Sequence, residues 1–79
     1  MFQIFKIEDA EKYGVYAAII IDIIYESNVG WSVEDLIRYC PYMSPKKINK
    51  LVNMLVTEGV IYPLRMSDAI EYFLVEDNA

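Results

Sequence analysis

Three lysines and two asparagines stand within eight residues in the second half of the chain, directly after a Ser-Pro pair. Ammonium groups pair with phosphates or with the acceptor atoms of guanine, and an asparagine amide can make paired hydrogen bonds to adenine. The alternative is an ordinary solvated helix face, and the residue types alone do not decide between the two. The five residues are Lys46, Lys47, Asn49, Lys50 and Asn53.

The segment that carries these side chains has clear helix start and stop signals. Ser44 is a good N-cap, Pro45 suits the first helical position, and Gly59 is expected to be the C-cap. The capped start, including Ser44, offers unpaired backbone N–H groups to a phosphate. One face of the segment is apolar, and it consists of Ile48, Leu51, Val52, Leu55 and Val56.

Charge is distributed unevenly along the 79 residues. Seven basic and twelve acidic side chains give a net charge of −5, which excludes a globally basic nucleic-acid coat. Residues 38–65, however, carry +4, while residues 1–37 carry −5 and residues 66–79 carry −4. Because exposed charges are screened beyond about 8 Å, one basic face can meet DNA while the rest repels it. Arg65 belongs to the basic segment and could contact the DNA backbone. The alternative is that it forms a surface ion pair with Asp68 or Glu71.

Composition speaks against enzymatic chemistry. The chain has no histidine and a single cysteine, Cys40, which rules out an internal disulfide framework, a Cys/His zinc site and a histidine triad. No Gly-rich phosphate loop or nucleophile–base pair is visible. We therefore expect no catalytic residue, no metal, no cofactor and no small-molecule substrate.

Hydropathy predicts no membrane segment and no export. The densest apolar run, Val15 to Tyr25, is interrupted by Asp22 and is shorter than the roughly 20 residues that a bilayer requires. The N-terminus lacks the features of a secretory signal. The expected location is the cytoplasm.

The order of elements predicts an α+β, mainly α, single domain over residues 1–79. Helices are expected over residues 9–27, from Ser32 until Pro41, and over 45–58; strands over 60–65 and 70–75 follow, and Val29–Trp31 could add a third. We expect residues 1–8 to form an N-terminal arm and residues 76–79 a loose tail. Pro63 confines its strand to an edge or a bulge. This is a three-helix winged helix-turn-helix with a C-terminal β-hairpin wing.

Two stretches resemble a known family. Gly14-Val15-Tyr16-Ala17-Ala18 with the apolar helix that follows, and Ser44 to Ile61, look like the winged-helix N-terminal domains of phage and plasmid replication proteins, the replisome-organiser and DnaD-like proteins. The resemblance implies duplex DNA binding or self-association in replication or transcription control, in the host cytoplasm if the chain is viral. By position, the resemblance implies that the lysines and asparagines of residues 46–53 contact the DNA.

A second surface is apolar. The helix predicted over 9–27 is apolar over about 200°, roughly twice the arc of an ordinary surface helix. A homodimer would cover this surface; the alternative is that the arm folds back onto its own chain. The alternative function is a protein-interaction module that binds a replication or host factor through this surface or the acidic flanks. The interface residues expected are Phe2, Ile4, Phe5, Val15, Ile19 and Ile23.

Four further residues are interpreted from their positions in the sequence. Trp31 and Cys40 are interpreted as core residues. For Tyr42 and Met43, in the turn between the second and third helices, packing is expected for one of the two.

Overall fold

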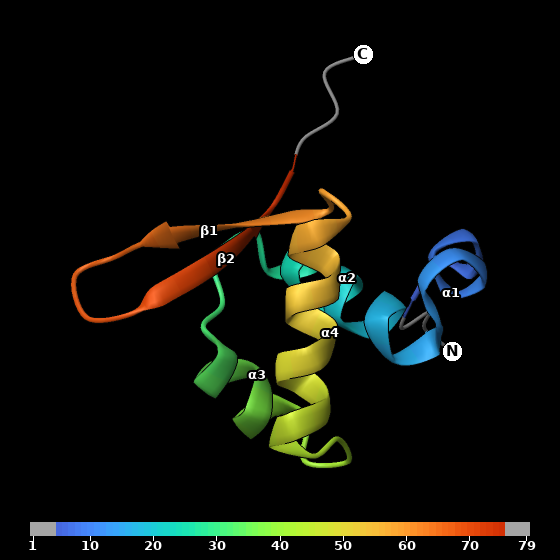
Figure 1. Ribbon diagram of the computed structural model, residues 1–79, viewed down its shortest axis with the longest axis horizontal. Helices are drawn as coiled ribbons and strands as arrows, with labels where there is room; N and C mark the ends of the chain where they lie inside the picture. Colours follow the sequence, from blue (N-terminus) through green and yellow to red (C-terminus); the bar gives the residue numbers. More distant parts are fainter. Residues whose placement is uncertain (1–4, 76–79) are drawn as a thin grey trace.

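The computed structural model describes residues 5–75 and shows an α+β fold that is mainly helical, as the sequence predicts. Four helices precede an antiparallel hairpin, whereas three helices were expected (Figure 1). The elements are α1 (Ile7–Tyr13), α2 (Val15–Ser27), α3 (Val33–Tyr39), α4 (Pro45–Thr57), β1 (Ile61–Arg65) and β2 (Ile70–Leu74).

The additional helix arises from a break at Gly14, so the prediction of one helix over residues 9–27 is wrong. Gly14 has φ 96° and ψ 158°, a backbone conformation that side chains with a Cβ avoid. Apolar residues continue on both sides of the break, which is why the pattern suggested a single helix. As a result, α1 leaves the axis of α2 and lies beside its first turns (Figure 1).

Side-chain hydrogen bonds cap the starts of α3 and α4, and the cap at Ser44 agrees with the prediction. The Ser32 hydroxyl accepts from the Asp35 N–H at 3.0 Å, and the Asp35 carboxylate accepts from the Ser32 N–H at 3.2 Å. This reciprocal pair is a capping box. At α4, the Ser44 hydroxyl accepts from the Lys47 N–H at 3.1 Å, and Pro45 occupies the first helical position.

The C-terminal end of α4 differs by one residue from the prediction, since the C-cap is Glu58 and Gly59 follows it. Gly59 has φ 79°. The Val60 N–H donates to the Leu55 carbonyl at 2.9 Å, which closes a Schellman motif and turns the chain into β1.

The hairpin strands pair from Ile61 opposite Leu74 to Arg65 opposite Ile70. Tyr72 pairs with Pro63 on one side and forms a bridge to Trp31 on the other. Pro63 therefore lies on an edge strand, as predicted. The third strand expected at Val29–Trp31 is reduced to that single bridge.

The core lies between α2, α3, α4 and the first residue of β1. Cys40 is fully buried, and Trp31 is half-buried against the core, in line with the predictions for both. Met43 is buried while Tyr42 is 59% exposed, so one residue of the turn packs, as expected. The largest fully buried side chains are Ile20, Leu36, Ile48, Val52, Leu55, Ile61 and Cys40.

Within residues 5–75, no helix is long and apolar enough to cross a membrane.

Candidate nucleic-acid interface

Helix α4 presents a polar face away from the core. At about 100° per residue, Lys46, Lys50 and Asn53 fall within an arc of about 60°. The opposite side of the helix carries the buried Ile48, Val52 and Leu55. In Figure 1, α4 lies at the front of the molecule with no element crossing over it. The central line of the exposed face therefore consists of two ammonium groups and one amide.

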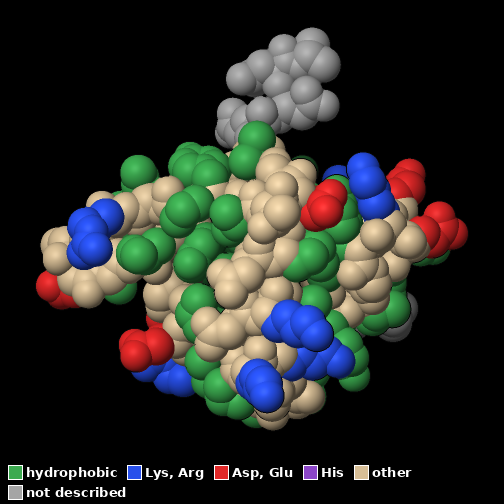
Figure 2. Space-filling model, viewed as in Figure 1, with side chains coloured by type: hydrophobic (Ala, Val, Ile, Leu, Met, Phe, Trp, Pro, Cys, Tyr) green, Lys and Arg blue, Asp and Glu red, His purple; other side chains and the backbone are tan. Residues whose placement is uncertain are grey.

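This face is also free of acidic side chains. Helix α4 has no Asp or Glu between Pro45 and Thr57. Lysine and arginine side chains gather over the N-terminal half of α4 in Figure 2, with no acidic group among them. Arg38, also in the basic segment, is instead held by Asp35 at 3.0 Å on α3. The positive potential is thus concentrated on the first turns of α4.

Lys47 lies on the flank of the face that is nearest to α2. Its Nζ is 4.1 Å from the centroid of the Tyr16 ring, a cation–π contact. Tyr16 belongs to the first turn of α2, and its ring centroid is 6.4 Å from that of Tyr42. Tyr16 is 41% exposed and Tyr42 is 59% exposed. Sequence reasoning missed Tyr16 as part of this surface, because no local pattern links it to a helix that begins far along the chain.

Tyr42 contributes no negative charge to this surface. Partial burial, followed by the hydrogen bond that its hydroxyl donates to the Cys40 Sγ, raises the pKa of Tyr42 to about 12. The phenol is therefore neutral at physiological pH and does not repel a phosphate.

The two asparagines are placed differently. The Asn49 side-chain amide donates to the Pro45 carbonyl of its own helix at 3.1 Å. By helical phase, Asn49 lies about 70° from the central line, on the flank opposite Lys47. Asn53 is exposed on the central line itself. Of the two amides, Asn53 is the better placed to contact a base.

Arg65 ends β1 at the hairpin loop, opposite Ile70, and is exposed. No ion pair involves Arg65 among the described residues, so the alternative partners Asp68 and Glu71 do not hold it. Arg65 comes from a different element than the lysines of α4. Its guanidinium is available to a ligand that reaches the loop of the hairpin.

The residues expected at a dimer interface are mostly covered by the chain itself. Ile19 is only 8% exposed, and Phe5 and Ile23 are half-buried against the core. Val15 remains 48% exposed. Tyr13, at the end of α1, also packs against the core. Phe2 and Ile4 lie outside the described residues.

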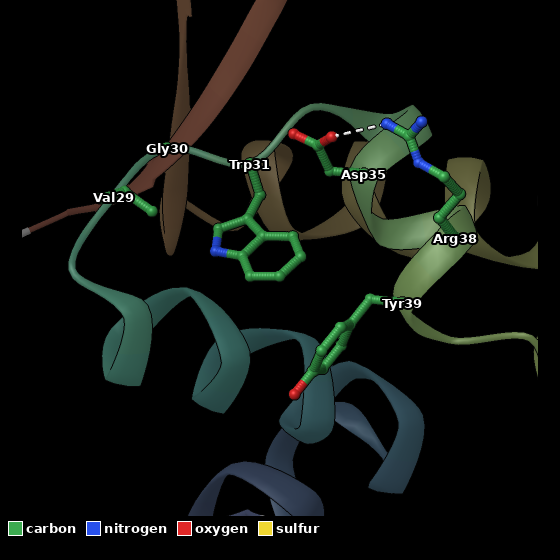
Figure 3. A pocket seen from close by; sticks show the side chains of 6 residues that line it. All are labelled: Val29, Gly30, Trp31, Asp35, Arg38 and Tyr39. Carbon is green, nitrogen blue, oxygen red and sulfur yellow. Dashed lines mark hydrogen bonds and ion pairs between the residues drawn. The ribbon is translucent and has the colours of Figure 1, made fainter.

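A separate open groove of about 390 Å³ lies between α3 and the segment before it. Figure 3 shows the Trp31 and Tyr39 side chains next to each other, with the Asp35–Arg38 ion pair at one end. The two ring centroids are 5.2 Å apart in an edge-on arrangement. The groove has aromatic walls, but its only charged groups neutralise each other.

Within the part of the chain that the structure describes, no group of three or more cysteine, aspartate and glutamate side chains could hold a metal ion.

Comparisons with protein-family models, with curated proteins and with solved structures found no match to this chain.

Proposed function

We propose that the protein is a winged helix-turn-helix protein that binds duplex DNA through α4. In this arrangement α2, α3 and α4 are the three helices, the β1–β2 hairpin is the wing, and α1 is an N-terminal addition. The observation that carries the proposal is the exposed face of α4, which presents lysines and no acidic group. A major groove is wide enough to admit an α-helix.

The geometry of the face divides its contacts. Lys46, Lys50 and Asn53 lie on the central line and would face base edges in the groove. Lys47, on the flank, would face the sugar–phosphate backbone, as would the backbone N–H of Lys46 at the start of α4. Arg65 would contact the backbone from the hairpin. Affinity would come mainly from phosphates, and sequence preference mainly from Lys50 and Asn53.

The process that this binding serves is proposed from the family resemblance. Replication or transcription control in the cytoplasm fits a small duplex-binding domain. A homodimer stays a prediction. We expect it because small domains often gain stability by association. Sedimentation of the purified chain gives its oligomeric state directly.

A protein-interaction module is the second candidate, and exposed apolar side chains outside α4 favour it. Tyr62, Leu64 and Val75 of the hairpin region are 43%, 48% and 44% exposed. Their strand positions place all three on the same face of the sheet, away from Ile61. Two results together would support this candidate. The wild type binds no duplex DNA at low salt, and it forms a stoichiometric complex with another protein. The Leu64→Lys variant no longer binds that protein.

The DNA proposal is tested by titrating the wild type and a Lys46→Ala/Lys50→Ala variant with duplex DNA over a series of salt concentrations. Each phosphate contact contributes about 0.9 to the slope of log K against log salt. Because the geometry places both lysines over base edges, the variant should bind a preferred sequence more weakly while its salt slope changes little. A slope smaller by about 2 would instead indicate that both lysines contact phosphates.

The matched control removes two lysines elsewhere. Lys6 is the N-cap of α1 and Lys12 lies in its last turn, and each lies over a tyrosine ring rather than on α4. A Lys6→Ala/Lys12→Ala variant has the same net charge as the test variant and should retain the wild-type slope. Equal losses in both variants, or no binding by the wild type, would contradict the proposal.

A further inference from the structure

We infer that Tyr16 is a positioning residue for DNA binding, which holds the Lys47 ammonium where it meets a backbone phosphate. The inference rests on the proposed function and extends the interface from α4 to the first turn of α2. The juxtaposition that carries it is the Lys47 Nζ over the Tyr16 ring at 4.1 Å. No sequence pattern assigns this role to Tyr16.

The ring of Tyr16 is itself held in place. It projects from the first turn of α2, directly after the break at Gly14. The Tyr42 ring lies beside it, with centroids 6.4 Å apart and planes inclined by 35°. The Tyr42 hydroxyl in turn donates to Sγ of the buried Cys40. The two packed rings thus lie beside an otherwise flexible lysine side chain.

This contact matters because lysine loses much rotamer freedom when it binds a phosphate. The cation–π contact restricts the ammonium before binding, so less freedom is lost in the complex. The ammonium keeps its charge and its hydrogen-bond donors in this contact. An aromatic ring face provides no carboxylate to compete with the phosphate, unlike an ion pair, which would neutralise Lys47.

The position of Lys47 specifies a phosphate as its ligand rather than a base. By helical phase, Lys47 lies about 90° from the central line of the α4 face. When the central line faces the floor of a major groove, the flanks face the two backbones that border it. The contact should therefore add affinity without sequence preference.

A double-mutant cycle on duplex DNA tests the inference, with Tyr16→Leu, Lys47→Ala and the double variant. We expect Tyr16→Leu to weaken binding about two- to fivefold, the range of an exposed cation–π contact. Lys47→Ala should weaken it further and lower the salt slope by about 1. The double variant should bind no more weakly than Lys47→Ala alone, because Tyr16 acts through Lys47.

Conservative variants separate positioning from a structural role. Tyr16→Phe keeps the ring face and should bind as the wild type does, and Lys47→Arg should also retain binding. Thermal unfolding of every variant identifies any loss of DNA binding that comes from a less stable fold. Because Lys47 is exposed, the Lys47 variants remain informative even if Tyr16→Leu is unstable. An equal loss in Tyr16→Phe and Tyr16→Leu would point to the hydroxyl and overturn the inference.

The failures of the two proposals are distinguishable. If the wild type binds no duplex DNA, the proposed function fails and this inference fails with it. If Lys46→Ala/Lys50→Ala weakens binding while the effects of Tyr16→Leu and Lys47→Ala simply add, only the inference fails. A Tyr16→Leu effect confined to single-stranded DNA would mean that the ring stacks on bases, which also overturns it.

Discussion

Trp31 and Tyr72 exchange both of their backbone hydrogen bonds, with N···O distances of 3.1 and 2.8 Å. This bridge joins the segment before α3 to the middle of β2, and so it ties the hairpin to the helices. On the opposite side of Tyr72 lies Pro63, which has no N–H to donate. The bridge therefore adds a second backbone connection between the hairpin and the helices, beside the turn at Gly59 that joins α4 to β1.

Gly30, next to the bridge, is expected to tolerate no side chain. A Cβ at this position would lie 2.5 Å from Cζ of Phe73 and 2.6 Å from a carboxylate oxygen of Glu71. Gly30→Ala should cost about 1–3 kcal/mol of unfolding free energy, the usual range for overpacking. Denaturant unfolding measures the loss. In a Phe73→Leu background, which frees space, the same substitution should cost less; an equal cost in both backgrounds would contradict the steric explanation.

Gly14 is expected to be needed for its backbone conformation alone. A Cβ there would meet nothing within 4 Å, but φ is 96°. Gly14→Ala should lower the unfolding free energy by about 1–3 kcal/mol, the cost of a conformation that is essentially restricted to glycine. A synthetic chain with D-alanine at position 14 is the control, because the D-residue accepts a positive φ. Similar stabilities of the L- and D-alanine chains would show that the break between α1 and α2 imposes no strain.

The N-cap of α4 should contribute measurably to stability. The Ser44 hydroxyl accepts the Lys47 N–H, so Ser44→Ala leaves that donor without its side-chain partner. The expected loss is about 1 kcal/mol, which lowers the midpoint of thermal unfolding by about 4–8 °C for a chain of this size. Ser67→Ala, in the exposed loop of the hairpin, is the matched control. A midpoint shift no larger than that of the control would contradict this role for Ser44.

Stability should fall in acid through Asp35. The Ser32 backbone N–H, and then Arg38, hold the pKa of the Asp35 carboxyl below its usual value of 3.8. Because the native state binds the proton less tightly than the unfolded state, this contribution is present above about pH 4 and is lost as the pH falls below it. Asp35→Asn should flatten the decline in unfolding free energy between pH 5 and pH 2. The control is Glu34→Gln, because the Glu34 carboxylate has no hydrogen bond in the described residues. This variant should lose unfolding free energy with falling pH nearly as the wild type does.

The sequence by itself determined the elements whose signals are local. Ser32 with Asp35, and Ser44 with Pro45, start helices through contacts within one turn, so both starts were predictable. The strands on either side of residues 66–69 were likewise predicted to within one residue. The basic face of α4 followed from helical periodicity, because the spacing of side chains along a helix fixes which of them share a face.

Tertiary structure decided which of these elements meet. Periodicity indicates that a face is apolar but not what covers it, so Ile19 was expected at an interface with a second chain although it is buried within its own. The break at Gly14 was ambiguous, since glycine also occurs inside helices. The contact of Tyr16 with Lys47 joins residues from different helices, and only the packing of α2 against α4 brings them together.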